Sequence, residues 1–301
     1  MKDIIDSYTN DLKRYLLSQK DFSGKYQLTT KSSFVTRKSI PPVNVSAITS
    51  IDFLQIVDRK KITSRLSFTE ISSESDNINM SEGIKEYQPF TKITPVIEVT
   101  RNMDGKVLNI SNISEIKADW EIWKHEQMPK LFPDKIWQLY ITSIYEAAIK
   151  SMEDNFDNFD DDLQYQLLLP ECYNFSKNPD IHEMGSTKTY HSRLIKDFEL
   201  FYCFEKKSFS DDDSIVKINL GILSDVEEEE KEEQLIAFYK KALPDFSCKD
   251  YLFDVNIEYT FDKHTSEIIY GKLSFIEQLH PNFVYTIEME LTRQEAHLNK
   301  I

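Results

Sequence analysis

Glycine is scarce in this chain, with six residues in 301 and no two of them closer than 22 positions. A chain of average composition and this length has about twenty. Dinucleotide-binding fingerprints, Walker loops and GxSxG nucleophile elbows need closely spaced glycines, because the backbone there turns sharply or approaches a ligand. None of these motifs can be formed here. We therefore expect no enzymatic activity and no cofactor.

The composition is that of a folded and acidic protein. Apolar residues make up 40% of the chain, which suffices for one large core or two ordinary ones. The formal charge is −15, from 51 acidic and 36 basic residues. Such a charge repels nucleic acids and anionic lipids unless a basic face is present, and the sequence shows none. We expect no nucleic-acid partner and no membrane partner.

The three cysteines are widely spaced and form no CxxC pair. An odd number of unpaired cysteines is typical of a reducing compartment. The first residues, Met1 to Asp6, contain acids where a signal peptide needs an apolar run. We therefore expect a cytoplasmic protein.

The pattern of apolar residues predicts an α+β fold with long-stranded antiparallel sheets (hairpins and a meander), each covered by amphipathic helices. Apolar residues at helical spacing predict helices over 2–19, 133–151 and 226–242. Residues 72–81 are interpreted as a loop, and the state of 112–128 is left open. Short turns between the runs favour antiparallel pairing. Strands are predicted over 45–57, 61–72, 97–100, 107–110, 187–204, 214–223, 251–261, 266–278 and 282–292.

Two local predictions are sharper. Asp104-Gly105 lies between two apolar runs, which is a strong signal for a tight hairpin turn. The stripe of helix 133–151 includes Trp137, which we expect to be buried against a sheet. The acidic stretch 153–162 marks a boundary between an N-terminal half, 1–160, and a C-terminal half, 161–301, that ends in the meander. A single continuous domain is the alternative.

The sequence contains only weak signals for a metal site or a catalytic nucleophile. His182 and His191, with Asp180 and Glu183, could form a metal site, but a solvated loop is the simpler interpretation. An EF-hand in the acidic stretch fails because Leu163 occupies the position that requires glycine. Cys203 lies in an apolar run and is expected to be a buried, inert thiol. No metal ligands and no catalytic residues are predicted.

The start of helix 226–242 is unusually acidic. The predicted partner-binding residues there are Glu227, Glu228, Glu229, Glu230, Glu232 and Glu233. Some of this charge suits the positive end of the helix dipole, but like charges four residues apart are mildly destabilising. A basic partner would relieve that repulsion and associate faster by steering. A solvated helical face is the alternative.

Three functions follow as hypotheses. The first is a non-enzymatic cytosolic protein-binding module that engages a basic protein partner through an acidic surface; an immunity or antitoxin-type protein is one concrete form. The second is a cup for an apolar ligand, formed by a curved sheet and a helix. The third is a hydrolase with a noncontiguous carboxylate or histidine site.

Overall fold

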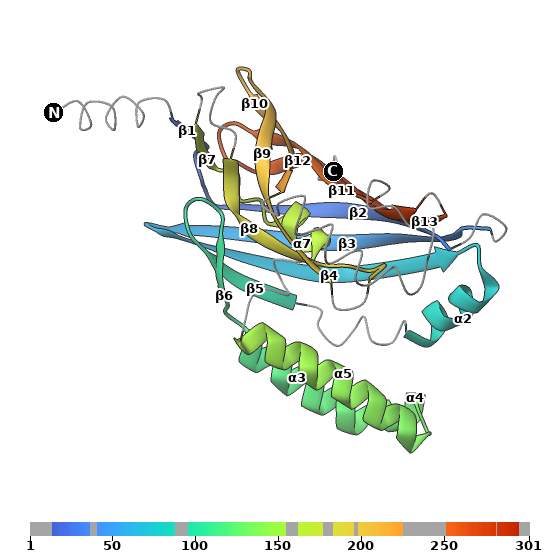
Figure 1. Ribbon diagram of the computed structural model, residues 1–301. Helices are drawn as coiled ribbons and strands as arrows, with labels where there is room; N and C mark the ends of the chain where they lie inside the picture. Colours follow the sequence, from blue (N-terminus) through green and yellow to red (C-terminus); the bar gives the residue numbers. More distant parts are fainter. Residues whose placement is uncertain are drawn as a thin grey trace, which may run out of the picture.

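The protein is seen in a computed structural model that describes residues 14–36, 41–87, 96–154, 162–176, 183–195, 198–224, 251–280 and 282–294. Its main feature is one antiparallel sheet of eleven strands in the order β6-β5-β4-β3-β2-β13-β12-β11-β10-β9-β8 (Figure 1). The strands are β2 (Phe22–Val35), β3 (Val43–Asp58), β4 (Lys61–Ser75), β5 (Val96–Arg101), β6 (Val107–Ile110), β8 (Glu183–His191), β9 (Glu199–Asp211), β10 (Ile215–Ser224), β11 (Leu252–Asp262), β12 (Ile268–His280) and β13 (Phe283–Gln294).

Nine of the ten strand pairs join strands that follow one another in the chain, and the exception is β2 with β13. That pair runs from Lys25 opposite Gln294 to Val35 opposite Val284. The sheet thus contains strands from both residue ranges, 1–160 and 161–301. A separate small sheet pairs β1 (Arg14–Leu16) with β7 (Asn174–Ser176).

The large sheet curls around a segment of the chain. Val107 of edge strand β6 and Lys188 of edge strand β8 line the same small cavity, so the two edges approach each other. Between them lie α7 (Leu163–Leu168) and the residues that lead from it into β7. We call residues 163–176 the plug segment and the concave side of the sheet the cup.

Alternation along the strands directs apolar side chains into the cup. On β3, Ile51 and Phe53 are 1% and 2% exposed, whereas Leu54 on the convex side is 40% exposed. Successive side chains of a strand point to opposite faces of the sheet. A curled sheet can therefore bury one face fully while the other stays in water.

The described helices other than α7 are α2 (Ile78–Tyr87), α3 (Ile113–Glu126), α4 (Met128–Leu131) and α5 (Lys135–Asp154). After β6 the chain forms a hairpin of α3 and α5, with α4 at its far end (Figure 1). Trp120 of α3 stacks on Tyr145 of α5 at 4.3 Å between ring centroids, and Lys124 pairs with Glu146 at 2.6 Å. None of the helices in the described residues is long and apolar enough to span a lipid bilayer.

Most of the predicted strands are confirmed. The meander is present as β11, β12 and β13, and the hairpin of β5 and β6 turns at Gly105, whose φ is +103°. The predicted helix 133–151 corresponds to α5. Its start is capped by Asp134, whose carboxylate accepts a hydrogen bond from the Ile136 N–H at 2.8 Å.

Other predictions were wrong or only partly confirmed. Residues 14–16 are a strand and not the end of a helix, because they pair with β7. A loop was expected over 72–81, but residues 72–75 extend β4 and residues 78–81 begin α2. Trp137 is 46% exposed and not buried, because α5 packs on α3 and turns this residue outward. The antiparallel sheet is confirmed, but its covering by amphipathic helices is not.

Candidate functional site

The plug segment fills one end of the cup. Leu167, Leu168 and Cys172 are 0% exposed, and Tyr173 is 2% exposed. The hydroxyl of Tyr259 on β11 donates to the Gln166 carbonyl oxygen at 2.8 Å. At the start of α7, the Asp162 side chain accepts from the Gln164 N–H at 2.8 Å. The segment is therefore held by the sheet through both apolar packing and hydrogen bonds.

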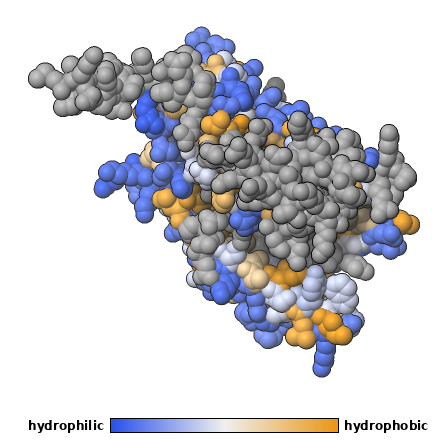
Figure 2. Space-filling view, in the orientation of Figure 1, coloured by the Kyte–Doolittle hydropathy of each residue, from blue (hydrophilic) through white to orange (hydrophobic). Residues whose placement is uncertain are grey.

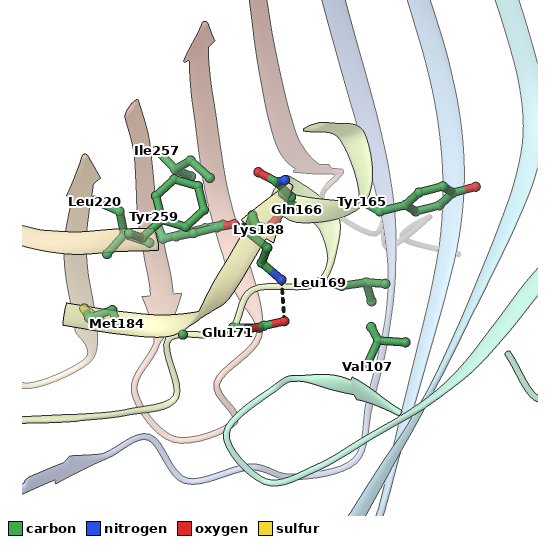
Figure 3. Close-up of a pocket in the computed structure, with 12 residues that line it drawn as sticks. Val107, Tyr165, Gln166, Leu169, Glu171, Met184, Lys188, Leu220, Ile257 and Tyr259 are labelled. Carbon is green, nitrogen blue, oxygen red and sulfur yellow. Dashed lines mark hydrogen bonds and ion pairs between the residues drawn. The ribbon is translucent and has the colours of Figure 1, made fainter. Parts of the chain in front are cut away.

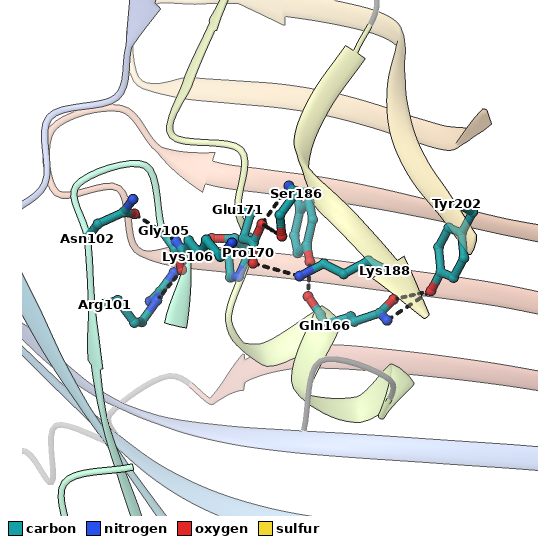
Figure 4. A network of polar contacts seen from close by, with 11 residues as sticks. Arg101, Asn102, Gly105, Lys106, Gln166, Pro170, Glu171, Ser186, Lys188 and Tyr202 are labelled. Atoms are coloured by element: carbon teal, nitrogen blue, oxygen red, sulfur yellow. Dashed lines mark hydrogen bonds and ion pairs between the residues drawn. The ribbon is translucent and has the colours of Figure 1, made fainter. Parts of the chain in front are cut away.

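Two neighbouring residues of the plug segment connect the two edges of the sheet (Figure 4). Arg101 on β5 is 0% exposed and donates to the Pro170 carbonyl oxygen at 2.7 Å and to Gly105 at 2.8 Å. Glu171 forms an ion pair with Lys188 of β8 at 2.6 Å. Pro170 thus binds the β5 side and Glu171 binds the β8 side of the curled sheet.

The Glu171–Lys188 pair is a charged group within an apolar interior. Their side chains are 10% and 5% exposed, and Ser186 also donates to Glu171 from its N–H and its hydroxyl. Burial raises the pKa of Glu171, but the charge and hydrogen bond of Lys188 and the Ser186 bonds outweigh it, and the net pKa lies below the ordinary value. Burial raises the pKa of Cys172 strongly, so this thiol is inert.

Beneath α7 the cup is almost full. A cavity of about 30 Å³ lies among Gln166, Leu169, Lys188, Leu220 and Tyr259 (Figure 3). A buried water needs roughly 10–15 Å³ of such space. This cavity has room for about two waters and is far too small for an organic ligand.

The other end of the cup is different, as four successive rungs, or rows of side chains, across β3, β2 and β13 show. Thr49, Leu28 and Leu291 lie side by side and are 7%, 0% and 0% exposed. Beyond them, the rungs are partly exposed apart from Met289. Their members are Ala47, Thr30 and Met289, then Val45, Ser32 and Ile287, then Val43, Phe34 and Tyr285. We call these three rungs the open end.

Aromatic rings connect the open end to the buried core. Phe34 contacts Tyr285 at 6.3 Å between ring centroids, and Tyr285 contacts Phe275 at 5.9 Å. Phe275 contacts Tyr190 at 5.2 Å, and Tyr190 contacts Phe253 at 5.0 Å. Such edge-to-face and tilted contacts fix the rings against one another. One wall of the cup is therefore formed by aromatic rings that contact one another.

One carboxylate lies in this wall. Glu277 pairs directly with Tyr285 and is 0% exposed. It accepts hydrogen bonds from the Tyr190 hydroxyl at 2.9 Å, from the Arg193 N–H at 3.1 Å and from the Ser192 hydroxyl. Burial, and then the Glu277 charge, raise the pKa of Tyr190 well above its ordinary value.

The residues singled out in the sequence are mostly not at this site. Glu227 to Glu233, Asp180, His182 and Cys248 lie outside the described residues. His191 is exposed and faces Glu199 across β8 and β9 at 3.2 Å. Cys203 is buried, as predicted. Within the residues that the structure describes, no group of three His, Cys, Asp or Glu could hold a metal ion.

The charged residues inside the cup were not predicted from the sequence, although the sequence contains a signal for two of them. Glu277 stands in phase with Leu273, Phe275 and Leu279, and Arg101 stands in phase with Ile97 and Val99. A charged residue on the apolar face of an alternating strand is buried with its partners. The alternation along the strands therefore identifies Glu277 and Arg101 as buried charged residues.

Comparison with known proteins adds little. No family model and no curated protein matches the sequence. The chain is similar in shape to lipovitellin, in a structure described as "lipid-protein interactions in lipovitellin", with 9% identity and a TM-score of 0.48; the match covers 92% of this chain and 25% of lipovitellin. It is also matched to DynF from the dynemicin biosynthesis pathway of Micromonospora chersina, with 6% identity, a TM-score of 0.20 and coverage of 93% and 83%. The chain thus spans a quarter of the lipovitellin chain.

Proposed function

We propose that the protein is a non-enzymatic binding protein that holds an apolar small molecule in the open end of the cup. The observation that carries this proposal is the change in exposure along the concave face. Leu28 and Leu291 are fully buried, whereas Phe34, Tyr285 and Ile287, on the same face of the same strands, are partly exposed.

The dimensions suit a small molecule. Neighbouring strands are about 4.8 Å apart and residues along a strand about 3.3 Å apart, so the open end measures roughly 10 Å across three strands and 13 Å along them. Its lining is mainly apolar, with the hydroxyls of Thr30, Ser32 and Tyr285 among aliphatic and aromatic side chains. Binding sites for small molecules have this combination of apolar walls and a few polar groups.

The chemistry of the wall favours an uncharged apolar ligand. The carboxylate of Glu277 already accepts three hydrogen bonds and is fully buried, so it does not need a cation from the ligand. Removing apolar surface from water supplies roughly 25 cal/mol per Å². The partly exposed side chains of the open end provide that surface without any ionic contact.

The test uses two substitutions of adjacent residues on β3. Ala47 points into the cup and Ile48, 44% exposed, points out of its convex side. We expect Ala47→Trp to fill the open end and to weaken binding of a neutral apolar fluorophore, N-phenyl-1-naphthylamine, at least tenfold. Ile48→Trp adds the same ring outside and should change the affinity less than twofold.

Two outcomes contradict the proposal. One is a wild-type protein that does not bind the fluorophore at all, and the other is equal affinity of both variants. Native mass spectrometry of the purified protein, before and after solvent extraction, then identifies the class of ligand that it carries.

A second candidate function is the protein-binding module that engages a basic partner. The observation that favours it is a groove of about 570 Å³ across β4, β3, β2 and β13, where Glu74, Asp76 and Glu288 outnumber Lys31. Charge reversal at Glu229, Glu230 and Glu233, which lie outside the described residues, tests the acidic helix predicted from the sequence. The triple Lys variant should bind a basic partner more slowly and with weaker salt dependence. Wild-type kinetics at low salt would exclude the acidic helix as the interface.

A further inference from the structure

Helix α5 has two apolar faces, and the described part of the chain covers one of them. Its inner face, with Ile141 and Ile149 at 6% exposure each, packs on α3. A second set recurs at helical spacing and is exposed: Trp137 at 46%, Tyr140 at 52% and Ile144 at 51%. Ile136 and Leu139 extend this set at 76% and 72%. We call these five residues the outer face of α5.

The outer face is contiguous, which distinguishes it from scattered exposed apolar residues. Residues three and four positions apart lie next to one another on a helix. In Figure 2, hydrophobic atoms gather at the lower end of the molecule, where Figure 1 places α4 and α5. Leu131 of α4, 45% exposed, adds to the patch. Exposed patches of this kind mark interaction sites.

We propose that the outer face of α5 is a dimer interface and that its occupant is the same face of a second copy of this chain. Two copies of one helix pack well in an antiparallel arrangement about a two-fold axis, because each residue then meets the residue at the mirrored position. With the axis near Tyr140, Ile136 and Trp137 of one copy lie against Ile144 of the other.

The charged residues nearest in sequence to the outer face of α5 are Asp134, Lys135 and Glu146, and Glu146 is already paired with Lys124 of α3. The contact between the two copies is therefore made by the apolar residues. Ala147 and Ala148 follow the apolar residues, and their small side chains let two helices approach closely.

The size of the patch agrees with a weak dimer. Five side chains that are half to three-quarters exposed present roughly 600 Å² per copy, so the pair would bury about 1,200 Å², the lower limit for specific interfaces. Trp137 and Tyr140 lie near its centre, as residues that dominate binding energy usually do. We therefore expect dissociation in the micromolar range.

The salt dependence of association distinguishes this dimer from a complex with a basic partner. The outer face itself carries no charge, while each copy carries a formal charge of −15. Two such copies repel each other at long range, and salt screens this repulsion. The dimer should therefore tighten when the salt concentration is raised from 50 to 500 mM, whereas a basic partner held by acidic residues should be released.

The test is sedimentation velocity of the full chain between 1 and 100 µM. We expect a concentration-dependent dimer for the wild type, and at least tenfold weaker association for Ile144→Asp. The matched control is Lys60→Ala in the exposed turn between β3 and β4, which makes the same change in net charge and should behave as the wild type. Circular dichroism shows whether each variant is folded.

A second measurement is independent of any destabilisation. In a Cys248→Ser background, Tyr140→Cys lies near the axis and should form a disulfide-linked dimer on mild oxidation, while Lys60→Cys in the exposed turn between β3 and β4 should not. Cys172 and Cys203 are buried and do not interfere. A wild type that stays monomeric at 100 µM in both salts, a dimer unaffected by Ile144→Asp, or equal cross-linking at both cysteines would overturn the proposal.

Discussion

Replacing Lys188 by Met removes one member of the buried ion pair that joins the plug segment to β8. The carboxylate of Glu171 then stays in an apolar surrounding without its cation, since its side chain is only 10% exposed. Breaking a buried pair in this way costs about 3–5 kcal/mol of unfolding free energy. Ser186 still donates two hydrogen bonds to Oε2 of Glu171, so we expect a loss near the lower limit, about 3 kcal/mol.

A double variant tests whether the unpaired charge of Glu171 causes the loss of stability. In the double variant Lys188→Met with Glu171→Gln, no buried charge is left unpaired, so most of the lost free energy should return. Stability is measured by urea denaturation followed by circular dichroism, with equal m-values as the check that unfolding remains comparable. The two residues touch, so their effects should be strongly non-additive.

Two results would refute this reasoning. A loss below about 1 kcal/mol for Lys188→Met would mean that water reaches Glu171 and that the pair contributes as little as a surface ion pair. A double variant whose loss equals the sum of the two single losses would mean that Glu171 and Lys188 act independently.

Three further predictions concern other parts of the molecule. The lowered pKa of Glu171 stabilises the folded state above the ordinary value of 4.5 and ceases to do so as pH falls through the folded pKa; the stability difference between wild type and Glu171→Gln should therefore shrink between pH 5 and pH 3 in urea titrations. Gly105→Ala should lower the unfolding free energy by about 2–4 kcal/mol, since Gly105 has positive φ and its Cβ would collide with the plug segment, whereas Gly83→Ala in open space on α2 should be neutral or stabilising; equal thermal midpoints would contradict this. Trp137→Ala should cost under about 1 kcal/mol at submicromolar concentration, against about 3–5 kcal/mol for Trp120→Ala, which is 2% exposed, and iodide should quench the fluorescence of Trp137 alone.

The sequence predicted those elements whose signal is local. Asp104-Gly105 required a turn because glycine accepts positive φ, and the short turns between the runs 251–261, 266–278 and 282–292 predicted the meander. The helix at 135–154 was equally clear. In each case the residues that determine the structure lie within a few positions of one another.

What the sequence could not predict depends on partners distant in the chain. Residues 14–16 have a helical pattern but pair with β7, about 160 residues later. The stripe on α5 was wide enough for a buried helix, and no local signal told which part of it would face α3. The open end could not be located from the sequence for the same reason. The exposure of its side chains depends on where the plug segment stops and not on the residues that line it.

The pairing of β2 with β13 has a consequence for how the chain is made. Lys25 pairs with Gln294, so the middle of the sheet cannot close until the residues up to 294 have left the ribosome. Until then β2 presents a free edge, while hairpins β2–β3 and β3–β4 can already form. Sheets that depend on such distant pairing fold slowly, and their open edges invite aggregation. We therefore expect the nascent chain to need protection by a chaperone during synthesis, and fragments that end before residue 283 to be insoluble.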